Sequence, residues 1–258
     1  MDSLITVRDE GAVRFLTINR PAQLNALNSS VLAELAIEIE RVQHERRVRC
    51  VVIAGAGERA FSAGADLDEI RGLSVEDAHD FIRGGHRAIG AVERSGVPVI
   101  AAVDGFALGG GFELVLACHV VISSERSQFG LPEARIGCIP GFGGTQRLGR
   151  SIGKPAAYHL MLTGSRIAAD RAWEMGLLSV PPVAVDDFDR EVNETASLIA
   201  SGSRGGLENI LEAARQSFAP AALGHEAVLA AKAIASADGQ EGITSFAERR
   251  APRFKEED

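Results

Sequence analysis

Short apolar runs in the first part of the chain are typical of β-strands. Segments 5–8 and 13–18 are separated by Asp9-Glu10-Gly11, which predicts two strands joined by a turn. Longer apolar runs without a polar interruption, as expected for strands covered on both faces, lie at 50–54, 97–103 and 120–122. We expect these runs to form the core strands.

Helical periodicity separates these strands and then replaces them. Between residues 29 and 45, apolar residues recur at intervals of three and four, which predicts a helix with Asn28 or Ser29 as its N-cap. A second helix is expected at 75–94. After Pro140 the helical segments lie at 144–151, 155–162, 168–175, 187–200, 205–216, 223–237 and 240–250. Alternating strands and helices followed by helices alone predict an α/β core with a helical C-terminal region.

The composition is that of an ordinary globular protein, with 46% hydrophobic and 24% charged residues among 258. A net charge of -8 and only three Lys argue against nucleic-acid binding, which needs a basic face. No apolar stretch approaches the roughly 20 residues that span a bilayer, and residues 1–4 do not begin a signal peptide. The three Cys lack disulfide-type spacing. We therefore expect a cytoplasmic protein with no membrane or nucleic-acid partner.

Several motifs that would indicate other chemistry are absent. The sequence has no G-x-S-x-G elbow, no Walker A loop and no pair of His at zinc-helix spacing. Segment 55–60 reads G-x-G-x-x-A after a strand, but the residues that follow lack a helical pattern, so we interpret it as a glycine turn. Neither a metal ion nor a separate cofactor is expected.

Two glycine-rich loops that lead into short helices are candidate oxyanion sites. In the first, 61–67, small residues allow a ligand to approach the backbone, and Asp66 is placed to cap a helix begun by residues 68–70. The second, 105–113, carries Gly109-Gly110-Gly111 at a helix start. Two backbone N–H donors exposed in this way can stabilise one oxyanion. The alternatives are a tight loop without a ligand and a turn that permits close strand–helix packing.

Two glutamates stand within or beside these segments. Glu113 lies in an apolar helix, where a carboxylate must be paired or face a pocket; alternatively, it is an exposed first-turn acid favoured by the helix dipole. Glu133 follows Pro132, a pattern that also suits a helix with Pro at its first position. A third glycine-rich loop, 137–148, leads into another helix. From the residues alone, both interpretations of each glutamate remain open.

In their order and spacing, six motifs resemble the crotonase (enoyl-CoA hydratase/isomerase) family. They are Asn19-Arg20-Pro21, Asn25-Ala26-Leu27, 61–67, 107–113, 129–133 and 140–148, and residues 242–250 are similar to the family's C-terminal helix. The resemblance implies an α/β fold, a crotonase-like spiral of ββα units with a helical C-terminal region. It further implies a core at 1–195, a trimerisation region at 196–258, and assembly as a trimer or a dimer of trimers.

The resemblance also implies chemistry at named positions. The thioester oxygen of an acyl-CoA would be held by the backbone amides of Ala65 and Gly110, and family hydratases use two glutamates, which are Glu113 and Glu133 here. We assign Glu113 to the activation of water and Glu133 to proton delivery at C2. The further substrate and CoA contacts implied by position are Gln23, Leu24, Ala26, Ala63, Asp66, Leu67, Gly109, Pro132, Gly141 and Phe142.

The activity that this resemblance implies is that of an enoyl-CoA hydratase, as used in fatty-acid β-oxidation, with CoA entering as part of the substrate. The alternatives are a Δ3-Δ2 enoyl-CoA isomerase, which needs one glutamate, another acyl-CoA enzyme of the family, and an RNA-binding protein, which the acidic composition disfavours. Leu131 stands where many hydratases have Gln, and Phe112 replaces a small residue beside the catalytic glutamate. These departures bear on acyl-chain length and leave room for isomerase activity.

Overall fold

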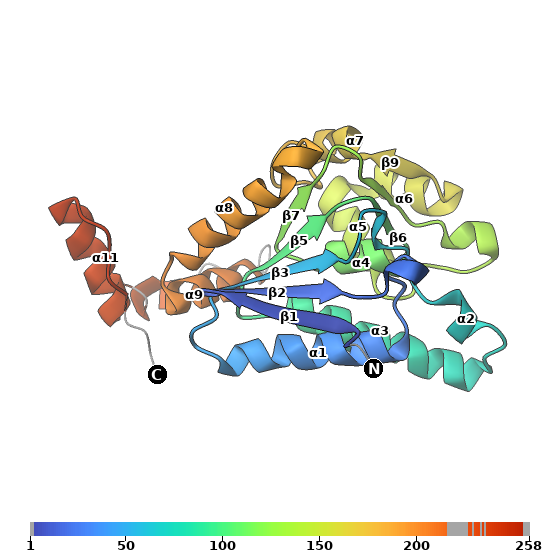
Figure 1. Cartoon of the computed structure of the whole chain (residues 1–258), viewed down its shortest axis with the longest axis horizontal. Helices are drawn as coiled ribbons and strands as arrows, with labels where there is room; N and C mark the ends of the chain where they lie inside the picture. The colour runs from blue at the N-terminus through green and yellow to red at the C-terminus, as the bar shows by residue number, and fades with distance from the viewer. Residues whose placement is uncertain (1–2, 216–226, 229, 233, 235, 255–258) are drawn as a thin grey trace.

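The computed structural model describes residues 3–215, 227–228, 230–232, 234 and 236–254. Within this part of the chain, two β-sheets form the centre of the protein and helices surround them (Figure 1). The main sheet has the strand order β1-β2-β3-β5-β7, and the smaller sheet has the order β4-β6-β8-β9.

The main sheet contains the strands predicted from the long apolar runs. Strand β1 (Ile5–Glu10) pairs antiparallel with β2 (Val13–Ile18), and β3 (Cys50–Gly55), β5 (Val99–Val103) and β7 (Val120–Ser123) follow in parallel. Four of the predicted strand ends differ in the structure, and β3 and β7 each end one residue later than expected. Strand β1 continues through Glu10, so the turn falls at Gly11, whose φ of 58° suits glycine. Strand β5 begins at Val99 instead of Val97.

Helices cover both faces of this sheet. The helices of the described residues are α1 (Ser29–His44), α2 (Leu67–Ile70), α3 (Val75–Glu93), α4 (Gly110–Val115), α5 (Gly144–Ile152), α6 (Lys154–Thr163), α7 (Ala169–Glu174), α8 (Phe188–Ala200), α9 (Arg204–Arg215) and α11 (Ala237–Glu248), with 3₁₀ turns η1 (Pro21–Gln23), η2 (Glu133–Ile136) and η3 (Val185–Asp187). Figure 1 shows α1 and α3 on one face of the main sheet and α8 on the other. At the predicted start of α1, the Asn28 side chain accepts the Val31 N–H at 2.9 Å.

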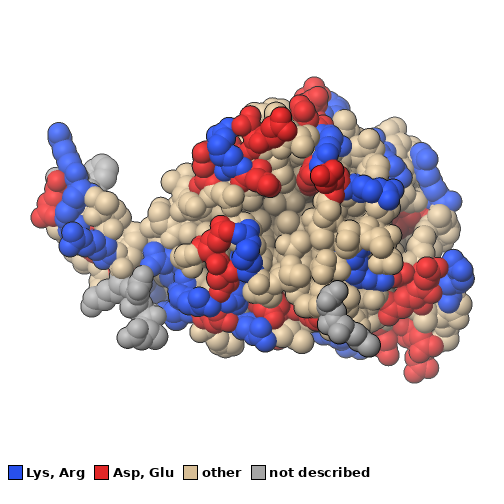
Figure 2. Space-filling view, viewed as in Figure 1, with Lys and Arg blue, Asp and Glu red and all other residues tan. Residues whose placement is uncertain are grey.

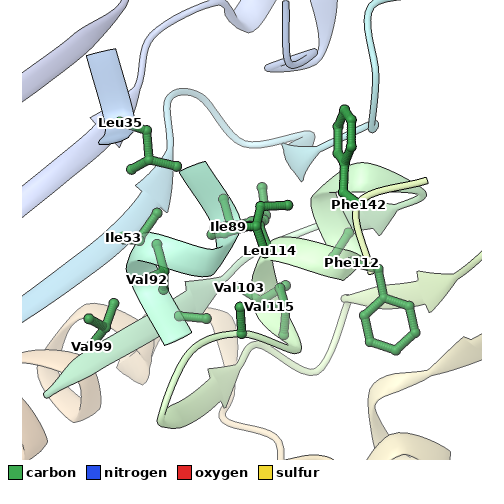
Figure 3. Packing of buried hydrophobic residues seen from close by; sticks show 14 of the residues in the cluster. Leu35, Ile53, Ile89, Val92, Val99, Val103, Phe112, Leu114, Val115 and Phe142 are labelled. Atoms are coloured by element: carbon green, nitrogen blue, oxygen red, sulfur yellow. The ribbon is translucent and has the colours of Figure 1, made fainter. Parts of the chain in front are cut away.

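The uninterrupted apolar runs follow from burial on both faces. In β3, Val51 and Ile53 belong to the larger core cluster, which includes residues of α1 and α3, whereas Cys50 and Val52 pack with α8. Figure 3 shows Ile53 among side chains of the larger cluster. Since successive strand residues point to opposite faces, a strand enclosed by helices must be apolar at every position.

The smaller sheet was not predicted, and interpreting residues 61–62 and 106–108 as parts of loops was wrong. Its strands are β4 (Ala60–Ser62), β6 (Phe106–Leu108), β8 (Gln128–Gly130) and β9 (Arg166–Ala168). Each strand spans only three residues, too few to establish a period of two in the sequence. Strands β4, β6 and β8 are parallel neighbours, and each leads directly into one of the predicted site motifs.

The helical C-terminal region is confirmed for the described residues. The predicted boundary between residues 195 and 196 falls inside α8, because Ala196 and Ala200 of this helix still pack against the main sheet. In Figure 1, α11 stands apart from the body of the protein. The predicted helix at 223–237 lies largely outside the described residues, and the trimerisation role of the C-terminal region stays a prediction.

Charged side chains of both signs are spread over the surface. Figure 2 shows them interspersed on the viewed face, with acidic groups gathered over α2 and the adjoining end of α3. This mixture agrees with the net charge of -8. Among the described residues, no helix is both long and apolar enough to cross a membrane.

Candidate active site

Three loops meet at one edge of the smaller sheet. Strand β4 continues into residues 63–66 and α2, β6 into Gly109 and α4, and β8 into Pro132 and η2. Because neighbouring parallel strands end at the same edge, the loops that follow them lie side by side. The smaller sheet thus brings together motifs that are tens of residues apart in the sequence.

A cavity of about 540 Å³ lies where these loops converge. Most of the predicted site residues line it, namely Ala63, Ala65, Leu67, Gly109, Gly110, Glu113, Pro132, Glu133, Gly141 and Phe142. Its apolar wall includes Ile70 of α2, Ile82 of α3, Ile136 of η2 and, three residues further on, Ile139. The cavity therefore combines an apolar wall with two carboxyl groups.

The amides of Ala65 and Gly110 are neighbours at the cavity wall. A Cβ built on Gly110 would lie 3.4 Å from the Ala65 nitrogen. In the described part of the chain, neither amide has a hydrogen-bond acceptor: Gly110 is the first residue of α4, where N–H groups lack intrahelical partners. Two unpaired donors on neighbouring loops can serve one oxygen atom of a ligand.

Backbone hydrogen bonds to the loop at 24–27 hold the Ala65 amide in place. The Ala63 N–H donates to the Leu24 carbonyl at 2.9 Å, and the Leu27 N–H donates to the Gly64 carbonyl at 2.8 Å. The next donor, Asp66 N–H, returns to the Leu27 carbonyl at 3.1 Å. The residues on both sides of Ala65 are thus hydrogen-bonded to the loop at 24–27, whereas the N–H of Ala65, which lines the cavity, remains unpaired.

Four predicted site residues do not line this cavity, namely Gln23, Leu24, Ala26 and Asp66. The Asp66 carboxylate caps α2 by accepting the Asp68 N–H at 3.1 Å, as predicted, and it pairs with Arg20 at 2.7 Å. The same Arg20 donates to the Ala26 carbonyl at 2.7 Å. These contacts connect the Ala65 loop to the segment at 20–26, and the predicted contacts of the four residues with CoA stay predictions.

Asn25 supports the same loop and was not among the predicted site residues. Its side chain is 1% exposed, accepts the Arg20 N–H at 3.0 Å, and donates to the Ala56 and Ala60 carbonyls at 3.0 and 2.7 Å. Leu24 and Asn25 have φ values of 51° and 57°, which are uncommon for residues other than glycine. The only sequence feature that pointed to Asn25 was the Asn25-Ala26-Leu27 motif. The motif does not reveal that the side-chain amide of Asn25 has a structural role.

Glu113 is buried and held by two backbone donors. Its side chain is 1% exposed, which excludes an exposed first-turn acid, and Oε1 accepts the N–H groups of Phe142 and Gly144, each at 2.7 Å. Burial raises the pKa of Glu113 to about 7, and the nearby Glu133 charge adds to this rise while the two N–H donors oppose it. The carboxyl group is therefore poised to exchange a proton near neutral pH.

Glu133 faces the same cavity from η2. Pro132 is the N-cap of this turn, so the prediction of Pro at the first helical position was wrong by one residue. Burial raises the pKa of Glu133, and within the described residues its buried Oε2 has no hydrogen-bond partner. A Cβ built on Gly109 would lie 2.9 Å from Glu133 Oε1, so this glycine allows the carboxyl group to approach the amide loop.

Arg147 is a further residue that sequence reasoning missed. Its guanidinium group donates to the Phe142 carbonyl at 2.9 Å and pairs with Glu93 of α3 at 2.7 Å. It thereby supports the loop that carries the two donors to Glu113, and its charge favours the ionised form of Glu113. Among the described residues, no group of three or more His, Cys, Asp or Glu side chains is arranged to hold a metal ion.

Two adjacent backbone donors, a buried carboxyl group and a half-buried one around one cavity are the arrangement expected of an enzyme that stabilises an oxyanion and transfers protons. Comparison with known proteins agrees with this class. Residues 8–257 match the family "Enoyl-CoA hydratase/isomerase". The chain belongs to the enoyl-CoA hydratase/isomerase family, as the motifs predicted.

Individual relatives match along nearly their whole length. A "Probable enoyl-CoA hydratase" of Rhizobium meliloti is 40% identical, over 97% of both chains, and a "Crotonyl-CoA hydratase" of Syntrophomonas wolfei is 36% identical, also over 97% of both. The crystal structure of an enoyl-CoA hydratase from Bacillus anthracis superposes with a TM-score of 0.95 at 37% identity, covering 99% of this chain and 100% of that one. The expected crotonase fold is thereby confirmed.

Proposed function

We propose that the protein is an enoyl-CoA hydratase, which reversibly adds water across the 2,3 double bond of an enoyl-CoA thioester to give a 3-hydroxyacyl-CoA. The observation that carries this proposal is the second carboxyl group, Glu133, which is half-buried and lines the same cavity as Glu113. Hydration requires both the removal of a proton from water and the delivery of a proton to carbon. The names of the relatives from Rhizobium meliloti and Syntrophomonas wolfei support the same reaction.

In the proposed mechanism, the amides of Ala65 and Gly110 bind the thioester oxygen. Attack of water at C3 moves the electrons of the double bond toward the carbonyl group, so negative charge develops on this oxygen. Donors fixed by the backbone are already oriented toward that charge and do not have to reorganise during the reaction. The proximity of the two amides supports this role.

The environments of the two glutamates support different roles for them. When the pair shares one proton, the N–H donors on Glu113 Oε1 favour the negative charge on Glu113. The unpartnered Oε2 favours the proton on Glu133. Glu113 then accepts a proton from the water that attacks C3, and Glu133 delivers a proton to C2.

The direct test is incubation of the purified protein with crotonyl-CoA. Hydration removes the conjugated double bond, so the absorbance of the enoyl thioester falls, and the product is 3-hydroxybutyryl-CoA. Identification of the product separates hydration from isomerisation, which moves the double bond and adds no water. An intact double bond after prolonged incubation at a range of substrate concentrations would reject the proposal.

We propose that the reaction needs no cofactor beyond the CoA of the substrate. Both glutamates and both amides belong to the protein, and together they supply the acid, the base and the oxyanion donors. Activity on crotonyl-CoA is therefore expected to be unchanged after dialysis against EDTA, measured as the rate of absorbance loss. A rate that is abolished by EDTA and restored by a divalent metal ion would contradict this prediction.

We propose that the protein assembles as a trimer or a dimer of trimers in the cytoplasm and acts in fatty-acid β-oxidation. Apolar side chains on the C-terminal helices support assembly, because Ile210 of α9 and Ile243 of α11 are exposed in the single chain. Light scattering at micromolar protein concentration is expected to give a mass three or six times that of one chain. The mass of a single chain would contradict the prediction.

A further inference from the structure

The Phe142 residue contributes both its backbone and its ring to the structure around Glu113. Its N–H donates to Glu113 Oε1 at 2.7 Å, while its ring is 2% exposed and packs against Phe81 with ring centroids 5.5 Å apart. Figure 3 shows the Phe142 side chain at the far end of the core cluster from Val99. The same residue therefore supplies a donor to Glu113 and a buried ring to the core.

Gly85 in the middle of α3 makes room for this ring. A Cβ built on Gly85 would lie 2.1 Å from Phe142 Cδ1 and 2.3 Å from Cε1, distances at which the ring has to move. On the other side of the ring, a Cβ built on Gly110 would lie 2.8 Å from Cδ2. The Phe142 ring thus fits between two glycines, one in α3 and one at the start of α4.

A neighbouring glycine in the same helix has no such role. A Cβ built on Gly84 would meet only Arg87 Nη2, at 3.9 Å, which is an ordinary contact. Glycine within a helix destabilises it relative to alanine because the unfolded chain gains conformational freedom. The Phe142 ring explains why glycine, despite this loss of helix stability, occupies position 85. The described structure gives no such reason for the glycine at position 84.

The loop that contains Phe142 has a second attachment to α3. Arg147 donates to the Phe142 carbonyl and forms an ion pair with Glu93, the last residue of α3. Helix α3 therefore fixes both sides of the same residue, the ring through Gly85 and the carbonyl through Glu93. Because Gly110 closes the other side of the ring, we expect displacement of the ring from α3 to shift the peptide that carries the N–H donor.

We infer that Gly85 is a positioning residue for the hydration reaction: by admitting the Phe142 ring, it keeps the Phe142 N–H on Glu113 and so keeps Glu113 ionised. This inference rests on the proposed function. The charged groups that face Glu113 are Glu133 from η2 and Arg147 from α5, and neither is moved directly by a change at Gly85. Gly85 itself touches no reacting atom.

The test compares Gly85→Ala with wild type on crotonyl-CoA. Loss of one hydrogen bond to a charged group is expected to lower kcat by about 10- to 100-fold with KM unchanged. Without the donor, the ionised form of Glu113 is less stable, so its pKa rises and the acid limb of the kcat–pH profile moves to higher pH. A purely structural change would lower the thermal stability without moving this limb.

Two further variants test whether the loss of kcat in Gly85→Ala is caused by displacement of the Phe142 ring. Gly84→Ala makes the same chemical change on the same helix and is expected to keep kcat within about twofold of wild type. In a Phe142→Leu background, whose shorter side chain can turn away from α3, adding Gly85→Ala is expected to lower kcat far less than it does in the wild type. Equal losses in both backgrounds, or in Gly84→Ala and Gly85→Ala, would overturn the inference.

Failure of the inference is distinguishable from failure of the proposed function. An inactive wild type would reject hydration, whereas an active wild type with a fully active Gly85→Ala variant would reject only the role of Gly85. The geometry is also measurable without any activity, in crystal structures of the wild type and of Gly85→Ala. The Phe142 nitrogen is expected to lie beyond hydrogen-bond distance of Glu113 Oε1 in the variant, and an unchanged distance would overturn the inference.

Discussion

Replacing Glu113 or Glu133 by Gln is expected to lower kcat for crotonyl-CoA hydration by at least about 10²-fold, the usual contribution of a general acid or base. A Gln amide neither accepts a proton from water nor delivers one to C2, although it fills nearly the same volume. Steady-state kinetics with each variant measure the effect. Wild-type turnover in either variant would remove that residue from the mechanism.

Controls for these variants come from the surface and from pH. Glu58 is exposed and does not line the cavity, so Glu58→Gln is expected to leave kcat unchanged. In the wild type, kcat is expected to fall as the pH drops through about 7, because Glu113 must be ionised to act as a base.

The elements that could be predicted from the sequence are those long enough to show a period. Helix α1 and strand β3 satisfy this condition, and their ends differ from prediction by one residue. The three-residue strands β4, β6 and β8 do not, and two of them lie within glycine-rich motifs that are typical of loops. Their pairing depends on contacts between distant segments, which local sequence patterns do not encode.

The candidate site shows the same limit. The sequence indicated that Glu113 was either paired in a pocket or exposed, and the choice depended on partners that lie 29 and 31 residues further along the chain. Neither Phe142 nor Gly144 could be identified as its hydrogen-bond donor from residue type, because both donate through the backbone. The resemblance to a family placed most residues at the cavity, but it did not identify Asn25, Arg147 or Gly85 as supports.

Replacing Gly110 by Pro is expected to remove about 2.7–4 kcal/mol of transition-state stabilisation, or about 10²- to 10³-fold in kcat/KM, the usual loss for one oxyanion donor. Proline deletes the N–H group itself. The position tolerates proline in the backbone, because Gly110 is the first residue of α4 and proline suits this position. Gly109, which precedes it, has no Cβ to collide with the proline ring.

The structure also supplies the control that separates the lost donor from steric effects. Gly110→Ala keeps the N–H group but adds the Cβ, which would lie 2.8 Å from the Phe142 ring. Part of the loss in Gly110→Pro is therefore expected in Gly110→Ala as well, and the further loss in the proline variant measures the donor. Ala65→Pro is the matching variant on the other loop, and circular dichroism with the oligomer mass verifies folding of all three. If folded Gly110→Pro and Gly110→Ala have the same kcat/KM on crotonyl-CoA, the second donor to the thioester oxygen lies elsewhere, and the pairing of Gly110 with Ala65 in one oxyanion hole is wrong.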